Sequence, residues 1–418
     1  MKRFLPFSLA VLAGMASLRN TPGQDAFSQD PDTLIPSETH RYLVMEGTIG
    51  SELGVRLTVT ATPDGTEKGG STVMGWYEYQ SIKRPIGLWG KLEDGRLTLE
   101  EGTPGTVDEE PVVTGRFDGS WTREKSAGSA ASQGTWSSPD GTRTLPFDLR
   151  ETYAPGIVPL DFYYVADELK TTRGSETVTR SRSVLFPQIR DTSPVIGRVN
   201  AFLRSIAASR GESAPEKSPL PEWFDPEKAP TLLAVEKETR IPPLEEDEQW
   251  VGSTLNYCDA DFEILYNSGG LLCVRVNQRE YFGSVREERS DYHVLLDLST
   301  GQQVSPDSLL REGWSESLVP LFEAKIRKEL EWPADLPFSD DGQFREGCKA
   351  HHNWYLCPEG IGISYIPFDL IASAWYPHHV VLTFEELAGF LKSDSPAGPG
   401  DESVNIPLKS LAKPLDHG

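Results

Sequence analysis

The sequence predicts an α+β protein: an N-terminal antiparallel β-barrel or sandwich, followed by an α+β domain with an antiparallel sheet and two to three helices. Three observations support this prediction. Apolar and polar residues alternate in short runs from residue 40 to 153, with turn signals between the runs. Beyond residue 160, strand-like runs are mixed with runs in which apolar residues recur every three or four positions. The length of 418 residues is sufficient for both domains.

The segment 1–28 predicts a signal peptide and the start of a polar tether. Lys2 and Arg3 precede a short apolar run, Leu5 to Ala16, which ends in small residues of the kind that signal peptidases recognise. This run is too short to span a membrane comfortably, and no later run approaches a spanning length. We therefore expect an exported protein, periplasmic or extracellular, whose mature chain has no membrane span.

The segment 40–153 predicts the all-β domain. From Val55 to Ala61, apolar residues alternate with polar ones, which is the pattern of a half-buried strand. The run from Leu97 to Leu99 repeats it, and turn signals such as Pro63-Asp64-Gly65 and Glu93-Asp94-Gly95 separate the runs. About eight short strands at a spacing of roughly twelve residues indicate a barrel or a sandwich.

Large aromatic residues recur beside glycines in this segment. Such rings can fill the interior of a small barrel, or they can line a cavity for a small apolar or sugar-like ligand, and the sequence leaves both interpretations open. The candidate ligand-binding residues are Trp76, Tyr77, Tyr79, Trp89, Trp121 and Trp136. Their phrases resemble those of avidin-type barrels and of an N-terminal module of uncharacterised exported bacterial proteins.

The segment 160–393 predicts the α+β domain. A helix is expected to begin near Ser193-Pro194, because proline is tolerated in the first turn and the apolar residues that follow share one face. The stretch 208–248 is rich in proline and acidic residues and indicates a surface insertion. The run from Trp314 to Trp332 predicts the main helix, and the tail 394–418 is expected to be disordered.

Four cysteines in an exported chain suggest two disulfides, for which three pairings are possible. Cys348 and Cys357 are nine residues apart and form the preferred pair, so that Cys258 with Cys273 follows by elimination. The second pair flanks a hairpin signal, Asn267-Ser268-Gly269-Gly270. A regular hairpin would not place these two cysteines opposite one another, so this pair requires a bulge or a loop.

The histidines close to Cys348 raise a metal site as an alternative. Cys348, His351, His352 and Cys357 are near one another in the sequence, and His378 with His379 could add ligands. Their spacing matches no zinc pattern, and adjacent histidines on a strand point to opposite faces. The disulfide is therefore preferred, and no metal or cofactor is predicted.

The charge excludes some classes of partner. The chain carries 63 Asp and Glu against 40 Lys and Arg, a formal net charge of −23. This balance argues against nucleic acid and against an anionic membrane surface. The nucleophile elbow, the zinc-protease motif, the P-loop and the dinucleotide fingerprint are all absent from the sequence, so no catalytic residue is predicted.

The C-terminal domain carries an ordered series of short motifs. Phe186-Pro187-Gln188-Ile189 is followed by Val199-Asn200, then by Asp297-Leu298-Ser299-Thr300-Gly301, and finally by Val380 to Leu387. In this order the motifs resemble the exported domain pair named domains of unknown function 4163 and 3298, which occurs in RsiV-type anti-sigma factors and beside a peptidoglycan deacetylase domain. The resemblance implies an envelope-facing α+β module that recognises a protein or a wall component.

The chain departs from that pattern in ways that limit the inference. The family's Gly-Ala-His before the Asp-Leu-x-Thr-Gly turn is replaced by Gly283-Ser284-Val285, without histidine. Two functions remain open. The first is an exported non-catalytic envelope protein that binds a protein, lysozyme-like for example, or a wall-derived glycan. The second is a hydrolase that acts on cell-wall polymer through paired carboxylates.

Overall fold

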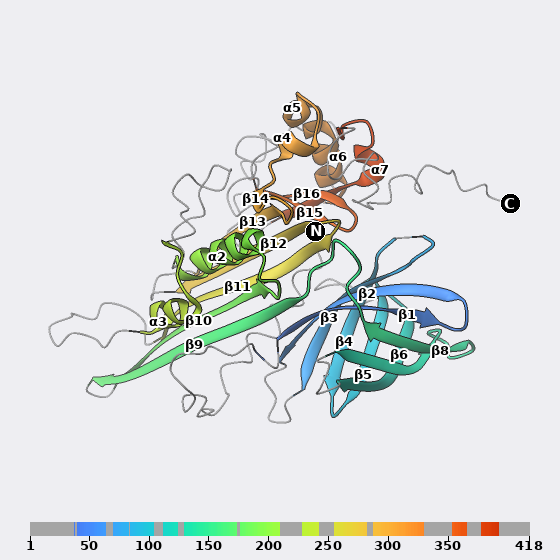
Figure 1. The fold of residues 1–418 in the computed structure, drawn as a ribbon, viewed down its shortest axis with the longest axis horizontal. Coiled ribbons are helices and arrows are strands. Elements are labelled where there is room, and N and C mark those ends of the chain that lie inside the picture. The colour runs from blue at the N-terminus through green and yellow to red at the C-terminus, as the bar shows by residue number, and fades with distance from the viewer. Residues whose placement is uncertain are drawn as a thin grey trace.

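The computed structural model describes eleven stretches of the chain and Ser37. The described stretches are 40–63, 70–82, 84–103, 112–123, 129–173, 176–209, 228–241, 255–281, 287–329, 353–365 and 378–392. The predicted signal peptide and the predicted disordered tail lie outside the described residues. The β-barrel lies on one side of the molecule, and the α+β part lies on the other side and above it (Figure 1).

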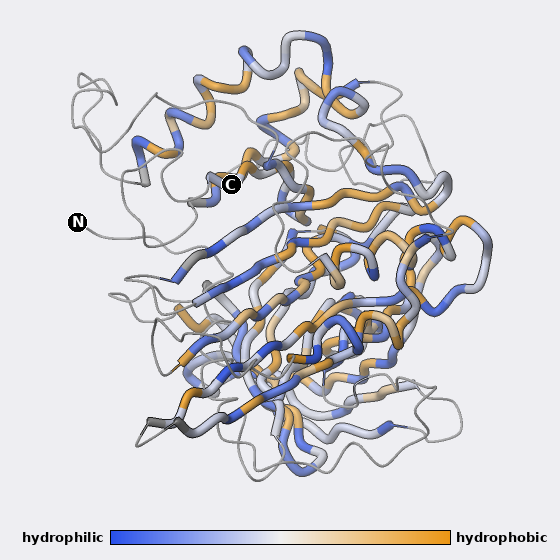
Figure 2. Tube along the Cα trace, turned by 90° about the vertical axis from the view of Figure 1, so that its left-hand side faces the viewer, coloured by the Kyte–Doolittle hydropathy of each residue, from blue (hydrophilic) through white to orange (hydrophobic). Residues whose placement is uncertain are grey.

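Eight antiparallel strands form a closed barrel, which decides between the barrel and the sandwich that the sequence allowed. Each strand pairs with the next, and β1 also pairs with β8, so the sheet closes on itself. The strands are β1 Arg41–Ile49, β2 Leu53–Pro63, β3 Ser71–Tyr79, β4 Ile86–Glu93, β5 Arg96–Thr103, β6 Val112–Arg123, β7 Ala130–Ser137 and β8 Thr144–Glu151. The hydropathy of the strands alternates along the tube, as the sequence pattern predicted (Figure 2).

Strand β1 connects the barrel to the α+β part within one 14-stranded sheet. Its second half, from Met45 to Ile49, pairs with β8, whereas Arg41 pairs with Asp161 at the start of β9, Leu160–Arg173. Its side chains alternate accordingly: Leu43 and Met45 lie in the barrel core, and Tyr42 and Val44 lie in the core of the α+β part. The two domains therefore share one continuous sheet.

The α+β part extends this sheet by β9 to β14. Its other strands are β10 Glu176–Ile189, β11 Leu255–Ser268, β12 Leu271–Tyr281, β13 Glu288–Asp297 and β14 Gln302–Gln303. All neighbouring pairs are antiparallel except β10 and β11, which run parallel. The connection between those two strands includes α2, Pro194–Ala208, and α3, Leu232–Thr239. The predicted antiparallel sheet thus contains one parallel pair.

Helix α2 begins where the sequence predicted. The Ser193 side chain accepts a hydrogen bond from the N–H of Ile196, and Pro194 occupies the first turn. Helix α2 covers one face of the sheet (Figure 1). Its apolar residues share a core with the sheet residues Phe262, Ile264 and Val274. Helix α3 lies within the stretch 208–248, for which the sequence predicted a surface insertion. It is capped by Thr231 and buries Val235, so this part of the insertion joins the core.

A small antiparallel sheet covers the opposite face of β11 to β13. Its strands are β15 Trp354–Cys357, β16 Gly360–Tyr365 and β17 His378–Thr383, in the order β15-β16-β17. The short helices α4 Pro306–Leu309, α5 Trp314–Ser317, α6 Val319–Glu329 and α7 Phe384–Leu387 pack with it. The predicted main helix is divided at Leu318, between α5 and α6. No described helix is long and apolar enough to cross a membrane.

Candidate functional site

Four of the six candidate aromatic residues lie in or against the barrel core, and the other two, Trp76 and Trp89, lie outside it. Tyr77 and Trp136 lie in the barrel core, and Tyr79 and Trp121 pack against it. Trp76 is partly buried and, as the neighbour of Tyr77 on the same strand, points to the outer face of the barrel. Trp89 donates its indole N–H to Glu100 at 3.1 Å. The six rings therefore form no single lining, and ligand binding by them stays a prediction.

A buried carboxylate lies among the inner rings of the barrel. Glu101 is 4% exposed and accepts hydrogen bonds from the Tyr77 hydroxyl at 2.5 Å, the Trp136 indole N–H at 2.9 Å and the Thr114 hydroxyl at 3.3 Å. A Cβ on Gly115 would lie 2.5 Å from the Glu101 side chain, so glycine is required there. Burial and the adjacent Glu101 raise the pKa of Tyr77, so the phenol donates and stays neutral.

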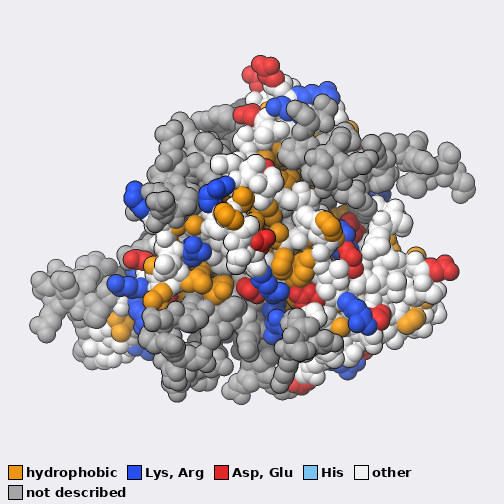
Figure 3. Space-filling view, in the orientation of Figure 1, with side chains coloured by type: hydrophobic (Ala, Val, Ile, Leu, Met, Phe, Trp, Pro, Cys, Tyr) orange, Lys and Arg blue, Asp and Glu red, His pale blue; other side chains and the backbone are white. Residues whose placement is uncertain are grey.

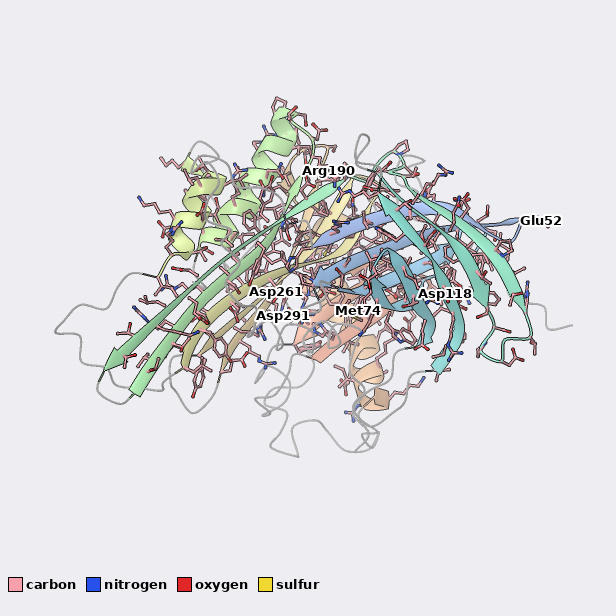
Figure 4. All side chains as sticks on the ribbon, turned by 90° about the horizontal axis from the view of Figure 1, so that it is seen from below. Glu52, Met74, Asp118, Arg190, Asp261 and Asp291 are labelled. Carbon is pink, nitrogen blue, oxygen red and sulfur yellow. The ribbon has the colours of Figure 1, made fainter. Side chains whose placement is uncertain are left out.

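The main concentration of polar groups lies on the face of β11 to β13 that the small sheet partly covers. Alternate residues of β11 place Asp259, Asp261 and Glu263 on this face, while the residues between them enter the apolar core on the α2 side. The pairing register then adds Arg275, Asn277 and Arg279 from β12, and Asp291 and His293 from β13. Asp261 and Asp291 lie close together beside the small sheet, whereas Asp118 lies on the barrel (Figure 4).

An ion pair between Arg275 and Asp291 forms the centre of this polar face. Their side chains are 7% and 2% exposed. Arg275 Nε donates to Asp291 Oδ2 at 2.9 Å, Nη2 donates to the same oxygen, and Nη1 donates to Glu263 at 3.2 Å. Burial opposes ionisation of Asp291, but the charge of Arg275 outweighs it and lowers the pKa of Asp291.

Histidines and an asparagine connect this face to the small sheet. His293 Nδ1 lies 2.8 Å from Asn353 Oδ1, and the Asn353 amide donates to the carbonyls of Asp291 and Ser364. The His293 ring stacks on Tyr355, with ring centroids 4.6 Å apart. His379 Nε2 lies 3.4 Å from Arg275 Nη2. Burial lowers the pKa of His293 to about 4, so this imidazole is neutral at pH 7.

Two carboxyl groups of β11 titrate differently from Asp291. Burial raises the pKa of Asp261 to about 7, although Arg279 and Arg275 oppose this shift. Burial also raises the pKa of Glu263, against the attraction of Arg275. Asn277 lies between Asp261 and Asp291 in the register and donates to Asp261 at 3.4 Å. The face therefore holds carboxyl groups with opposite pKa shifts on β11 and β13, the two strands that flank β12.

The cysteine prediction requires a correction. The thiols of Cys258 and Cys273 are free. Cys258 lies opposite Glu280, seven positions along β12 from Cys273, and at about 3.3 Å per residue this places the two roughly 20 Å apart. The hairpin register therefore excludes the Cys258–Cys273 disulfide. The thiol of Cys357 is free as well and donates to the Gly360 carbonyl at 3.5 Å, so the structure does not contain the predicted Cys348–Cys357 disulfide, although Cys348 itself lies outside the described residues.

The histidine pairs that raised the metal alternative are only partly described. His351 and His352 lie outside the described residues, whereas His379 contacts the Arg275–Asp291 pair. Within the described stretches, no group of three or more His, Cys, Asp or Glu residues is placed to hold a metal ion. His379 therefore participates in the polar face between the two sheets.

Sequence reasoning missed this polar face almost entirely. The alternation Asp259-x-Asp261-x-Glu263 could have identified a strand with three carboxylates on one face. Arg275 and Asp291 are sixteen residues apart and meet only through the β12–β13 register. No local spacing in the sequence predicts that meeting.

The chain is similar to several solved structures, among them two DUF3298 family proteins. No protein-family model and no curated protein matches the chain. A DUF3298 family protein from Bacteroides fragilis has 17% sequence identity and a TM-score of 0.45, covering 57% of this chain and 96% of its own. A DUF3298 family protein from Pseudomonas aeruginosa has 12% identity and a TM-score of 0.41, covering 58% of this chain and 98% of its own. Domain 3298 is one of the two families whose motifs the C-terminal segment resembles.

Proposed function

We propose that the protein is an exported, non-catalytic binding protein of the cell envelope, and that the polar face of β11 recognises a partner rich in hydrogen-bond donors. One observation carries this proposal: the carboxylates of the face are more exposed than the arginines that pair with them. The Glu263 side chain is 32% exposed against 7% for Arg275, and Asp259 is 26% exposed against 15% for Arg279. The groups available to a partner are therefore mainly acceptors.

Such a face suits two kinds of envelope ligand. A basic protein, lysozyme-like for example, would offer lysine and arginine side chains, and a wall-derived glycan would offer hydroxyl and amide donors. The net charge of −23 adds long-range attraction for the basic protein only. Figure 3 shows the α2 side of the molecule, which is not the polar face, and there basic and acidic side chains are interspersed.

Binding measurements on the mature protein test this proposal. Purified lysozyme and soluble peptidoglycan fragments are titrated by calorimetry into the wild type and into Glu263→Gln. The expected result is binding of one ligand that Glu263→Gln weakens about tenfold, as for one charged hydrogen bond. Asp118→Asn is the matched control, because that carboxylate is 53% exposed on the barrel. If the wild type binds neither ligand, the proposal is contradicted.

The hydrolase remains a second candidate because of the carboxyl pKa values on this face. Asp261, with its pKa raised to about 7, could act as a general acid, and Asp291, with its pKa lowered, stays ionised. Release of reducing ends from peptidoglycan is the assay. Turnover that falls at least about 100-fold in Asp261→Asn, with binding retained, would favour the hydrolase. Absence of turnover in the wild type would leave binding as the function.

A further inference from the structure

The interface between β13 and the small sheet contains three buried polar atoms that no described group satisfies. We propose that Asp291 Oδ1, His293 Nε2 and Ser364 Oγ together bind one small hydrogen-bond donor, either a water molecule or an ammonium ion. The site lies in the fully buried part of the polar face, and it does not depend on the function proposed for the exposed carboxylates of that face. The three atoms are fully buried and lack a hydrogen-bond partner.

The free oxygen of Asp291 follows from the way Arg275 binds it. An arginine that faces a carboxylate often uses two N–H groups for two oxygens. Here Nε and Nη2 both donate to Oδ2, and Oδ1 receives nothing. A buried carboxylate oxygen without a donor is costly, so Oδ1 needs a donor from elsewhere.

The free nitrogen of His293 is also an acceptor. The Asn353 amide nitrogen is fixed as a donor, because it lies 2.8 Å and 3.1 Å from two carbonyl oxygens. Its Oδ1 is therefore an acceptor, and the partner atom, His293 Nδ1, must carry the proton. A neutral imidazole with Nδ1–H has a lone pair on Nε2. His293 Nε2 lies 3.7 Å from Asp291 Oδ1. Two hydrogen-bond acceptors therefore face one another without a donor between them.

Ser364 is assigned as the third contact because the Asn353 amide donates to the carbonyls of both Asp291 and Ser364, which places Ser364 beside Asp291. It is 0% exposed, and its position on β16 lies directly opposite His379 on β17. Gly362, two residues earlier on the same face, leaves room for the Tyr355 ring, because a Cβ there would lie 2.2 Å from that ring. Tyr355 in turn stacks on His293, so Ser364, Tyr355 and His293 belong to one contact region between the sheets.

The chemistry of the three atoms selects the ligand. Two facing acceptors exclude an anion. No described group of three His, Cys, Asp or Glu side chains is placed to hold a divalent cation. A second proton on His293 is disfavoured because burial, together with the Arg275 charge, lowers its pKa against the opposing effect of Asp291. A small molecule that donates two or more hydrogen bonds satisfies all three atoms.

Nuclear magnetic resonance of the full protein tests the site at His293. At pH 7 we expect the Nδ1–H tautomer with an unprotonated Nε2, and a cross-relaxation signal from the ring to a slowly exchanging water. A signal that appears only with added nitrogen-15 ammonium chloride would identify ammonium as the ligand. A proton on Nε2 would overturn the proposal, because His293 would then donate directly to Asp291. Absence of both signals would overturn it as well.

The variant Ser364→Ala tests the third contact. Loss of one hydrogen bond should speed exchange of the bound molecule about tenfold while the fold is kept. Ser132→Ala is the matched control: Ser132 is 1% exposed, but its hydroxyl donates to the Ser120 carbonyl in the barrel at 2.9 Å. Equal exchange in wild type and Ser364→Ala would remove Ser364 from the site and contradict the three-atom proposal.

Discussion

Arg275 directs two of its N–H groups, on Nε and Nη2, to a single oxygen of Asp291. Both side chains are almost fully buried, so neither charge has water as an alternative partner. In such a pair the partner that remains after a substitution is an uncompensated buried charge. The pair is therefore a point at which one substitution can unfold the domain.

Asp291→Ala should lower the free energy of unfolding by about 3–5 kcal/mol, because it leaves the Arg275 charge buried. Urea unfolding at pH 7 measures the change. The control is Asp118→Ala, which breaks the exposed Arg96–Asp118 pair, with side chains 64% and 53% exposed. That change should cost under about 1 kcal/mol. Equal effects of the two substitutions would contradict the prediction.

Stability should fall as the pH drops from 6.5 towards 4. Burial lowers the pKa of His293 to about 4, so between these values the unfolded chain binds a proton that the folded chain does not. His40 has the same shift from the same cause. Each histidine contributes about 3 kcal/mol above pH 6.5 that is lost by pH 4. His293→Gln should remove about half of this loss in urea unfolding, and an unchanged pH profile would argue against it.

Asp261 should make the protein less stable as the pH rises, which is opposite to the effect of the two histidines. Its pKa is raised to about 7 by burial, so from about pH 4 to 7 the folded chain holds a proton that the unfolded chain releases. The contribution to stability is present below pH 4 and is lost as the pH rises through 7. Asp261→Asn should therefore stabilise the protein at pH 8, on the order of 2 kcal/mol, and not at pH 4. A gain that is the same at both pH values would contradict the titration.

Glu101 is expected to stabilise the barrel through its buried hydrogen bonds. Glu101→Ala leaves the Tyr77 hydroxyl and the Trp136 indole N–H buried without an acceptor, at a cost of about 2–4 kcal/mol. Trp89→Phe is the comparison, because its bond to Glu100 is only partly buried, and it should cost less. Thermal unfolding followed by tryptophan fluorescence measures both. A larger loss for Trp89→Phe would contradict the importance given to Glu101.

Asn267 holds the segment 152–159, which connects β8 of the barrel to β9 of the α+β part. Its amide oxygen accepts from the N–H of Val158 at 3.0 Å, and its amide nitrogen donates to the carbonyl of the same residue at 2.8 Å. Asn267→Ala should cost about 2 kcal/mol. Hydrogen exchange should show loss of protection at Val158. Asn267→Asp keeps the acceptor and should retain that protection; equal loss in both variants would count against this role.

The sequence predicted elements whose signals are local. The alternation around Val55 predicted a barrel strand, and Ser193-Pro194 predicted the start of α2. It could not predict that β10 and β11 run parallel, because this depends on where a long connection returns. It also paired Cys258 with Cys273 by elimination, and the register overturns this because Cys258 lies opposite Glu280.

The candidate site was beyond local reasoning for a related reason. Asp261, Arg275 and Asp291 come from three strands, and each looks like an ordinary surface residue in the sequence. The aromatic rings of the barrel gave a stronger signal, and Tyr77 and Trp136 do meet around Glu101. The sequence did not indicate that a carboxylate would lie between them.

Strand β1 makes the two domains depend on one register. Because Met45 packs in the barrel core and Tyr42 in the other core, inserting one residue between them would turn one end of the strand inside out. Neither core could be repaired without displacing the other. Although Figure 1 suggests two separable bodies, they should therefore melt in one cooperative transition, and a domain boundary cut through this strand would destroy both.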